Sequence, residues 1–258
     1  MPSKAHIAIC NLKGGTGKTT CAVNIAANLA FLGKKILLVD ADPQCDCTEY
    51  FVDPNELLPQ NTLESLYIEG HTTSASDLIH TTRISGLDLI PCSENLALIS
   101  YKVASFSLNS ILNEVSPVYD AVIIDTHPDL GVYTKGALQA ATHVIVPLQP
   151  ERAPVRGFAR FWDTLNVLAE QISLLGVVCT QLDERGKSHK EWANLIKEEF
   201  GESFLGDIHR ATIVNEAADR RLTLREVSTS ARAYREMLAL TKEIGLRLGM
   251  ENGQRIRR

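Results

Sequence analysis

The segment Asn11–Asn24, NLKGGTGKTTCAVN, places glycines, lysines and threonines between a strand-like run and a helix-like run. Glycines let a loop curl so that successive backbone N–H groups point at phosphate oxygens, and the start of the following helix adds positive potential. In such a loop Lys18 reaches the β- and γ-phosphates of a nucleotide, and the Thr19 hydroxyl ligates Mg²⁺. The residues therefore predict a site for a nucleoside triphosphate. A second lysine, Lys13, stands at the mouth of the loop and needs its own explanation.

Three aspartates follow two later strand-like runs. The run KILLVDADPQ contains Asp40 and Asp42, and the run DAVIIDTHPD contains Asp125. Because parallel strands bring their carboxyl ends to one edge of a sheet, these carboxylates are expected beside the phosphate loop. There, one can hold Mg²⁺ directly or through water while another orients the attacking water. Each aspartate alone could cap a helix, but their order after a phosphate loop favours the metal and water roles.

Short apolar runs alternate with helical patterns along the chain. The runs are rich in Ile, Val and Leu without clean alternation, as expected of strands buried on both faces of a parallel sheet. This order predicts an α/β fold: a single-domain, doubly wound, mostly parallel sheet with helices on both faces. The expected strands span 5–10, 35–40, 87–92, 120–125, 143–148 and 174–180, and the expected helices span Thr19–Leu32, Ser93–Glu114, Gly131–Ala141, Val155–Glu170 and His189–Phe200.

The remaining segments have weaker patterns. Apolar residues at helical spacing predict a final helix within 228–249, and Asp53–Thr82 is expected to be a helical excursion between strands. We expect one domain over 1–249, followed by a basic, flexible tail over 250–258, where only two residues are apolar. Such a tail lacks the bulky apolar face of a membrane-binding amphipathic helix.

Composition limits the class of protein. The chain has 258 residues, of which 45% are hydrophobic, enough for a sizeable core. It has no apolar run of membrane-spanning length, and its six cysteines lie in apolar contexts, as expected of reduced thiols in the cytoplasm. Because the net charge is −5, any surface that binds nucleic acid must be a local basic patch.

The motifs KGGTGKTT, LLVDADPQ and AVIIDTHPDLG resemble the deviant Walker A, Walker A′ and Walker B motifs of ParA/MinD-type ATPases. The first glycine of the usual loop is replaced by Leu12, and Lys13 follows it. The resemblance continues through HVIVPLQPERAPVRGF to IVNEAADRRLTLREVSTSARAYREM, so it covers nearly the whole chain. It is strongest to the short, Soj-like ParA ATPases that partition chromosomes and plasmids, and it implies a P-loop NTPase that uses ATP and Mg²⁺.

The resemblance also implies roles for single residues. Two protomers would sandwich two ATP molecules, and Lys13 of each would reach the nucleotide of the other, as an arginine finger does. Lys18 would bind the phosphates, Asp42 would position or activate the water, Asp40 would help to organise the metal side, and Asp125 would hold Mg²⁺ through water. The residues of the phosphate cradle would be Lys13, Gly14, Gly15, Thr16, Gly17, Lys18, Thr19 and Thr20, with Thr19 also ligating Mg²⁺.

The chain departs from the family pattern at two places. Cys45 stands where glycine is usual, and His127 and Pro128 follow the Walker B strand where two prolines are common. Cys45 and Cys47 are more simply small buried residues than metal ligands, because no other cysteines lie near them in sequence. His127 could accept a proton at the active edge, but an ordinary loop histidine is the simpler interpretation.

Three roles of such ATPases need to be distinguished. In DNA segregation the ATP dimer binds double-stranded DNA without sequence preference, and a ParB-like protein stimulates slow hydrolysis; such a protein would be cytoplasmic and nucleoid-associated. The alternatives are positioning a protein cargo, such as a carboxysome or chemotaxis cluster, and MinD-like membrane association, which the polar C-terminus disfavours. Contacts with DNA phosphates need arginine or lysine, and the predicted residues are Arg210, Arg220, Arg221, Arg225, Arg232 and Arg235.

Two other classes of protein share this fold or could use it. A metabolic or metal-carrier enzyme on the same fold would need a substrate pocket or a cluster of cysteine pairs, and the sequence indicates neither. A non-catalytic scaffold is disfavoured because Lys18, Thr19, Asp42 and Asp125 are all present.

Overall fold

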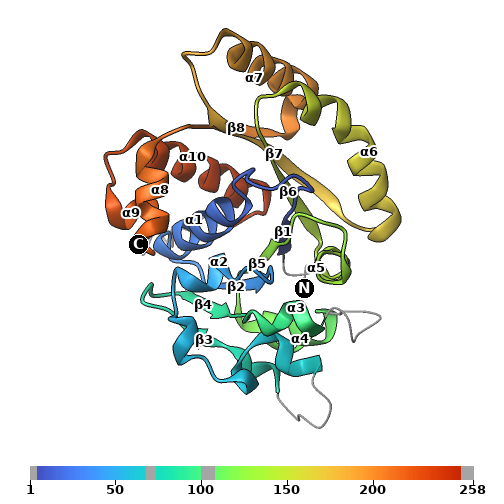
Figure 1. Ribbon diagram of the computed structural model, residues 1–258, viewed down its shortest axis with the longest axis vertical. Helices are drawn as coiled ribbons and strands as arrows, with labels where there is room; N and C mark the ends of the chain where they lie inside the picture. The colour runs from blue at the N-terminus through green and yellow to red at the C-terminus, as the bar shows by residue number, and fades with distance from the viewer. Residues whose placement is uncertain (1–4, 68–73, 100–107, 251–258) are drawn as a thin grey trace, which may run out of the picture.

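A computed structural model describes residues 5–67, 74–99 and 108–250 of the chain (Figure 1). Within these residues one eight-stranded sheet has the order β3-β4-β2-β5-β1-β6-β7-β8. Every neighbouring pair is parallel except β3 and β4. The strands are β1 (Ala5–Ile9), β2 (Ile36–Ala41), β3 (His80–Thr81), β4 (Leu87–Ile90), β5 (Ala121–Thr126), β6 (His143–Leu148), β7 (Ser173–Leu182) and β8 (Phe204–His209).

Ten α-helices occur in the described part of the chain and cover both faces of the sheet (Figure 1). In Figure 1, α3 and α4 lie at the lower end of the molecule, and α6 and α7 lie at the upper end. The helices are α1 (Lys18–Phe31), α2 (Asp46–Glu49), α3 (Asn95–Ile99), α4 (Asn109–Val115), α5 (Val132–Ala140), α6 (Arg152–Leu168), α7 (Lys187–Phe200), α8 (Thr212–Asp219), α9 (Leu224–Val227) and α10 (Arg232–Arg247).

Both faces of the sheet are apolar, which explains why the strand sequences do not alternate. Ile7 and Ile9 of β1 belong to the core cluster built with α1 and α10. Ala8, between them, belongs to the cluster on the other face with α6 and α7. A third cluster joins Val122 and Ile124 of β5 to α4 and α5. Successive residues of a strand point to opposite faces, so a strand covered on both sides needs apolar residues at every position.

The predicted fold class is confirmed, and all six predicted strands occur within two residues of their expected ends. The predicted helices at 19–32, 131–141, 155–170 and 189–200 correspond to α1, α5, α6 and α7, and α10 is the final helix. The sequence did not indicate β3, β8, α2, α8 or α9. Strand β8 lies at the edge of the sheet and is only partly buried, so it lacks the continuous apolar run of a central strand.

Two predicted helical segments differ from expectation. The single helix predicted over Ser93–Glu114 is wrong in the described residues, which form the two short helices α3 and α4; residues 100–107 lie outside the described part. Between 53 and 82 the structure has short 3₁₀ turns at Pro54–Glu56, Pro59–Asn61, Leu63–Tyr67 and Ala75–Leu78 and no α-helix in the described residues. Pro59 would interrupt a helix that continued from the turn at Pro54, because a proline inside a helix removes a backbone hydrogen bond and clashes with the preceding turn.

The tail predicted over 250–258 lies outside the described residues except for Met250, which packs against the core. Among the described helices, none combines the length and the apolar character that crossing a membrane requires.

Gly176 in β7 tests how tightly β7 and β8 pack. A Cβ atom at this position would overlap the side chain of Leu205 and lie 2.7 Å from the carbonyl oxygen of Ser203. We expect Gly176→Ala to lower the free energy of unfolding by about 1–3 kcal/mol or more, as overpacking does. A Cβ atom at Gly245 in α10 would meet nothing within 4 Å. Gly245→Ala should therefore raise the free energy of unfolding by about 0.5–1 kcal/mol, because alanine is more favourable than glycine within a helix. Urea denaturation measures both, and equal effects would contradict the packing argument.

Candidate functional site: a phosphate loop facing two buried carboxylates

The phosphate loop runs from the end of β1 to the start of α1. Gly15 and Gly17 have φ angles of 71° and 86°, a left-handed conformation that side chains disfavour. Added Cβ atoms at Gly14 and Gly15 would meet nothing within 4 Å, so the backbone there borders open space. Helix α1 begins at Lys18, which is buried, and Thr19 lies one position further into its first turn. The predicted loop and helix are therefore present, with room for phosphate above the glycines.

Side chains from β7 and from the residue after β6 hold the loop in shape. The carbonyl oxygen of Gly15 accepts hydrogen bonds from Gln149 Nε2 at 3.0 Å and from Gln181 Nε2 at 2.6 Å. The carbonyl oxygen of Thr16 accepts one from Thr180 Oγ1 at 2.8 Å. Gln181 itself has a φ of 55°. The sequence motifs did not predict these three contacts; the signal available was the position of the three residues at the carboxyl ends of two predicted strands.

Strand register brings the predicted carboxylates beside the loop. Asp125 in β5 pairs with Ile9, near the end of β1, on one side and with Asp40 in β2 on the other. Asp40 and Asp125 are completely buried, and Asp42 is nearly so. The expectation that one edge of the sheet gathers these residues is thus met by the structure. The detailed surroundings of the three carboxylates differ.

Asp40 has both oxygens engaged by its own chain. Oδ1 accepts from the backbone N–H of Asp42 at 3.1 Å, and Oδ2 accepts from the N–H and hydroxyl of Thr48 at 2.8 and 2.7 Å. Burial raises its pKa to about 6, and the hydrogen bonds from Thr48 and Asp42 act in the opposite direction. In this geometry Asp40 fixes the loop that follows β2. Its predicted role on the metal side stays a prediction.

Asp125 differs from Asp40 in its hydrogen bonds. Neither of its carboxylate oxygens has a hydrogen-bond partner in the described part of the chain, although both are buried. Burial raises its pKa well above the usual range, and the negative charges of Asp40 and Asp42 act in the same direction, while Thr19 and Lys18 act against them. Carboxylate and hydroxyl oxygens are ligands that Mg²⁺ prefers, and Asp125 and Thr19 supply one of each. Asp125 and Thr19 therefore fit the predicted magnesium site.

A cavity of about 880 Å³ opens in front of these residues. Lys18, Asp42 and His127 line one part of it, and Asp183, His209 and Asn215 line another. This volume is within the range of pockets that bury a small molecule. The cavity thus extends from the phosphate loop to the ends of β7 and β8, which leaves room for a nucleoside beyond the phosphates.

Comparisons with known proteins agree with this geometry. A family model described as "AAA domain" matches residues 4–174. The virulence plasmid ParA family protein pGP5-D of Chlamydia psittaci is 31% identical over 246 residues, which cover 92% of this chain and 93% of that protein. The chromosome-partitioning ATPase Soj of Thermus thermophilus is 34% identical over 242 residues, covering 90% and 93% of the two chains. The chain belongs to the ParA family.

Solved structures resemble this ParA-family chain in fold. MinD of Pyrococcus horikoshii, solved with Mg-ADP, has a TM-score of 0.82 at 18% identity, covering 96% of this chain and 98% of that one. Apo McdA of Cyanothece has a TM-score of 0.77 at 22% identity, covering 93% and 98%. Cobyrinic acid a,c-diamide synthase of Mycobacterium smegmatis, solved with an ATP analogue and magnesium, has a TM-score of 0.72 at 25% identity, covering 93% of each. Together with family membership, these structures support ATPase activity in general and the binding of nucleotide with Mg²⁺ in this fold family.

Lys13 of this ParA-family chain lies at the surface of the loop. Its Nζ donates to Gln149 Oε1 at 2.8 Å and forms an ion pair with Glu151 Oε2 at 2.7 Å. The side chains of Lys13 and Glu151 are 44% and 46% exposed. The amine is therefore held by its own chain at the rim and not directed into the phosphate loop.

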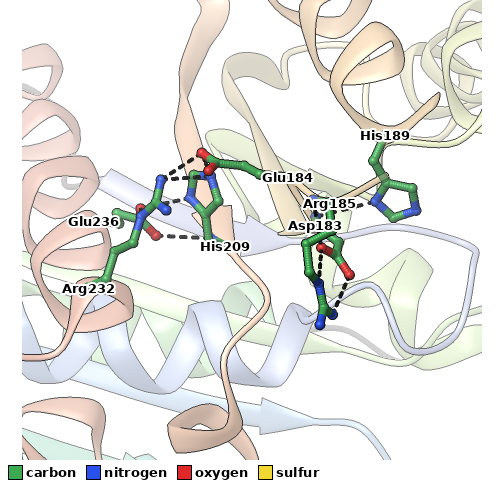
Figure 2. Close-up of polar contacts among 7 residues, drawn as sticks. All are labelled: Asp183, Glu184, Arg185, His189, His209, Arg232 and Glu236. Carbon is green, nitrogen blue, oxygen red and sulfur yellow. Dashed lines mark hydrogen bonds and ion pairs between the residues drawn. The ribbon is translucent and has the colours of Figure 1, made fainter. Parts of the chain in front are cut away.

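The six arginines predicted to bind DNA are in different environments. Arg232 forms ion pairs with Glu184 at 3.0 Å and Glu236 at 2.7 Å, in the cluster around His209 that Figure 2 shows. Arg220 pairs with Glu216, and Arg221 pairs with Glu49. The guanidinium of Arg225 lies 4.1 Å from the centre of the Phe31 ring. These four side chains already have partners within the protein.

Arg210 and Arg235 differ from the other four. Both are exposed, and no hydrogen bond or ion pair to either guanidinium occurs among the described residues. Arg210 lines the cavity, whereas Arg235 lies on α10. Of the predicted set, Arg235 is therefore the best probe of a DNA contact that is separate from nucleotide binding.

The six cysteines are free thiols, and all are buried. Cys45 adopts a φ of 60°, the conformation that the family's usual glycine would adopt without strain. Its Sγ lies 3.1 Å from that of Cys92. Among the described residues there is no group of three or more His, Cys, Asp or Glu side chains arranged to hold a metal ion. The interpretation of Cys45 and Cys47 as buried residues agrees with this arrangement.

The orphaned carboxylate of Asp125 leads to a prediction. A buried acid whose folded-state pKa is raised lowers stability at every pH above its unfolded-state pKa, so the neutral isostere Asp125→Asn should raise the melting temperature of the nucleotide-free protein at neutral pH. The same change should remove most of the extra stabilisation by Mg-ATP, which depends on affinity. Thermal melts with ATP, with and without Mg²⁺, measure both effects. Asp163→Asn, on the exposed side of α6, is the control; a full Mg-ATP shift in Asp125→Asn would contradict the assignment.

Proposed function

We propose that this ParA-family protein forms a homodimer across two ATP molecules, binds double-stranded DNA without sequence preference, and hydrolyses ATP when a ParB-like partner stimulates it. The cycle would segregate plasmid or chromosomal DNA in the cytoplasm, at the nucleoid. The observation that carries the proposal is the position of Lys13 beside a complete phosphate loop. A single protomer needs only Lys18 for its own nucleotide, and a second, exposed lysine at the rim is available to another protomer.

The contacts of Lys13 are consistent with such a transfer. Its ion pair with Glu151 is exposed at both ends, and exposed ion pairs contribute only about 0–1 kcal/mol. A triphosphate presented by a second protomer carries several negative charges, so exchanging Glu151 for phosphate favours the dimer. Each ATP would then be bound by Lys18 of one protomer and Lys13 of the other. This arrangement links dimer formation to the presence of the γ-phosphate.

The residues for hydrolysis have separate tasks in the proposal. Bound Mg²⁺, held by Thr19 and Asp125, would offset charge on the phosphates. Asp42 reaches the cavity and would orient the attacking water. Lys13 and Lys18 would stabilise the charge of the transferring phosphoryl group from two sides. Turnover by a single protomer would be slow, because the cross-interface lysine is in place only in the dimer.

Lys13→Ala tests the dimer. We expect it to keep ATP binding by the monomer but to weaken the ATP-dependent dimer and to lower hydrolysis by about 1,000-fold or more, the scale of losing a positive charge supplied across an interface. Lys18→Ala should lose nucleotide binding altogether, and Lys187→Ala, exposed on α7, should change nothing. Light scattering with ATP and a phosphate-release assay give the two readouts. Normal hydrolysis together with an unchanged dimer in Lys13→Ala would show that the proposed role is wrong.

DNA binding is tested with the variant Asp42→Ala, which we expect to bind ATP without hydrolysing it. We expect it to bind unrelated duplex DNA with ATP but not with ADP, and affinity should fall steeply with salt. Adding Arg235→Glu should weaken binding and reduce the salt slope by about 1 or more. Adding Arg160→Glu on α6, the same charge change at an exposed residue elsewhere, is the control. If Arg235→Glu leaves the ATP-dependent affinity for DNA unchanged, the DNA contact lies elsewhere on the protein. If the protein binds no DNA in any nucleotide state, the proposed DNA role is wrong.

A further inference from the structure

His127 contacts the carboxylate that is assigned to the attacking water. It lies one residue after the end of β5, and its Nδ1 is 2.7 Å from Asp42 Oδ1. Both residues line the cavity in front of the phosphate loop. An ionised carboxylate only accepts hydrogen bonds, so we assign the ring proton to Nδ1, with His127 as the donor. The interpretation of His127 as an ordinary loop residue does not account for this contact.

The two carboxylate oxygens of Asp42 differ in their hydrogen bonds. Oδ1 accepts from His127 and from the backbone N–H of Gln44 at 3.0 Å. Oδ2 has no hydrogen bond in the described part of the chain. Two donors on one oxygen fix the plane of the carboxylate and leave the second oxygen for a ligand in the cavity. Groups held in place before the reaction lower the cost of reorganisation when charge moves.

His127 is itself held in place. Its carbonyl oxygen accepts from Thr134 Oγ1 at 3.1 Å, which joins the loop to α5. The second ring nitrogen, Nε2, lies 3.9 Å from Asp129 Oδ2, too far for a hydrogen bond. Among the residues that the structure describes, the ring therefore has one short polar contact, which is with Asp42. The proline that the family pattern commonly has at this position carries no side-chain donor, so the contact belongs to this chain's own sequence.

We propose that His127 is a positioning residue for ATP hydrolysis: its Nδ1–H donates to Asp42 Oδ1 and holds the carboxylate so that Oδ2 engages the attacking water. The proposal rests on the ATP hydrolysis proposed above. In this role His127 acts through Asp42 and needs no contact with the nucleotide. Its loss should therefore lower the rate of hydrolysis without lowering the affinity for ATP.

The test compares two amides that replace different halves of the imidazole ring. The Asn side-chain nitrogen stands close to the position of Nδ1, and the Gln nitrogen stands closer to that of Nε2. For His127→Ala we expect kcat to fall about 10- to 100-fold, as for other residues that orient a functional ligand, with KM nearly unchanged. His127→Asn should recover kcat to within a few-fold of the wild type, and His127→Gln should not. His80→Asn, on the edge strand β3, is the matched control and should behave as the wild type.

The kinetic results separate a positioning role of His127 from a packing role. Unchanged kcat in His127→Ala, or equal recovery by Asn and Gln, would overturn the positioning role, because packing alone would then explain the contact. A lower kcat that is matched by weaker binding of a fluorescent ATP analogue would also overturn it. If His127→Ala fails to fold, as judged by its thermal melt, the comparison of Asn with Gln still decides. No hydrolysis by the wild type would overturn the proposed function and this inference together, whereas wild-type hydrolysis with an unaffected His127→Ala overturns the inference alone.

Discussion

The charge of Asp125 is buried in the middle of the sheet, and the described residues give its two oxygens no hydrogen bond. A buried carboxylate is a costly group in a folded protein, and Lys18 and Thr19 offset only part of the cost here. The surrounding core has to supply the stability that this residue costs. It does so with strands that are apolar on both faces and with helices on each side, so that the carboxylate is held rigidly between β1 and β2. A bound cation would satisfy it, which links the stability of the protein to occupation of the site.

The phosphate loop depends on the same sheet for its shape. Its glycines give freedom to the backbone, and that freedom has to be limited before the N–H groups can act together. The carbonyls of Gly15 and Thr16 are bonded by Gln149, Thr180 and Gln181, which come from strands β6 and β7 and their ends. Gln149 also accepts from Lys13. A movement of Lys13 toward a second protomer would therefore change one of the contacts that hold the loop.

The distribution of arginines shows why a count of positive charge in sequence is a weak indicator of nucleic-acid binding. Four of the six predicted residues are engaged by carboxylates or by an aromatic ring of the same chain. Exposed ion pairs of this kind are weak, so they do not forbid DNA contacts, but they reduce the local positive potential. Helix α10 illustrates the point, since Arg232 is neutralised by two glutamates while Arg235, one turn away, is not.

The sequence by itself determined the fold class, the six principal strands and the phosphate loop, because these depend on local patterns: runs of apolar residues, glycines before a helix, and aspartates at strand ends. It did not determine the edge strand β8 or the turns between 53 and 82, where partial burial and prolines leave no clear period. Only the tertiary structure decided which groups face the carboxylates. Asp40 and Asp125 have the same residue type at corresponding positions of neighbouring strands, yet Thr48 satisfies one and leaves the other without a partner. The contact of His127 with Asp42 joins residues far apart in the chain, and the parallel pairing of β2 with β5 brings them together, since no local pattern encodes a distance across a sheet.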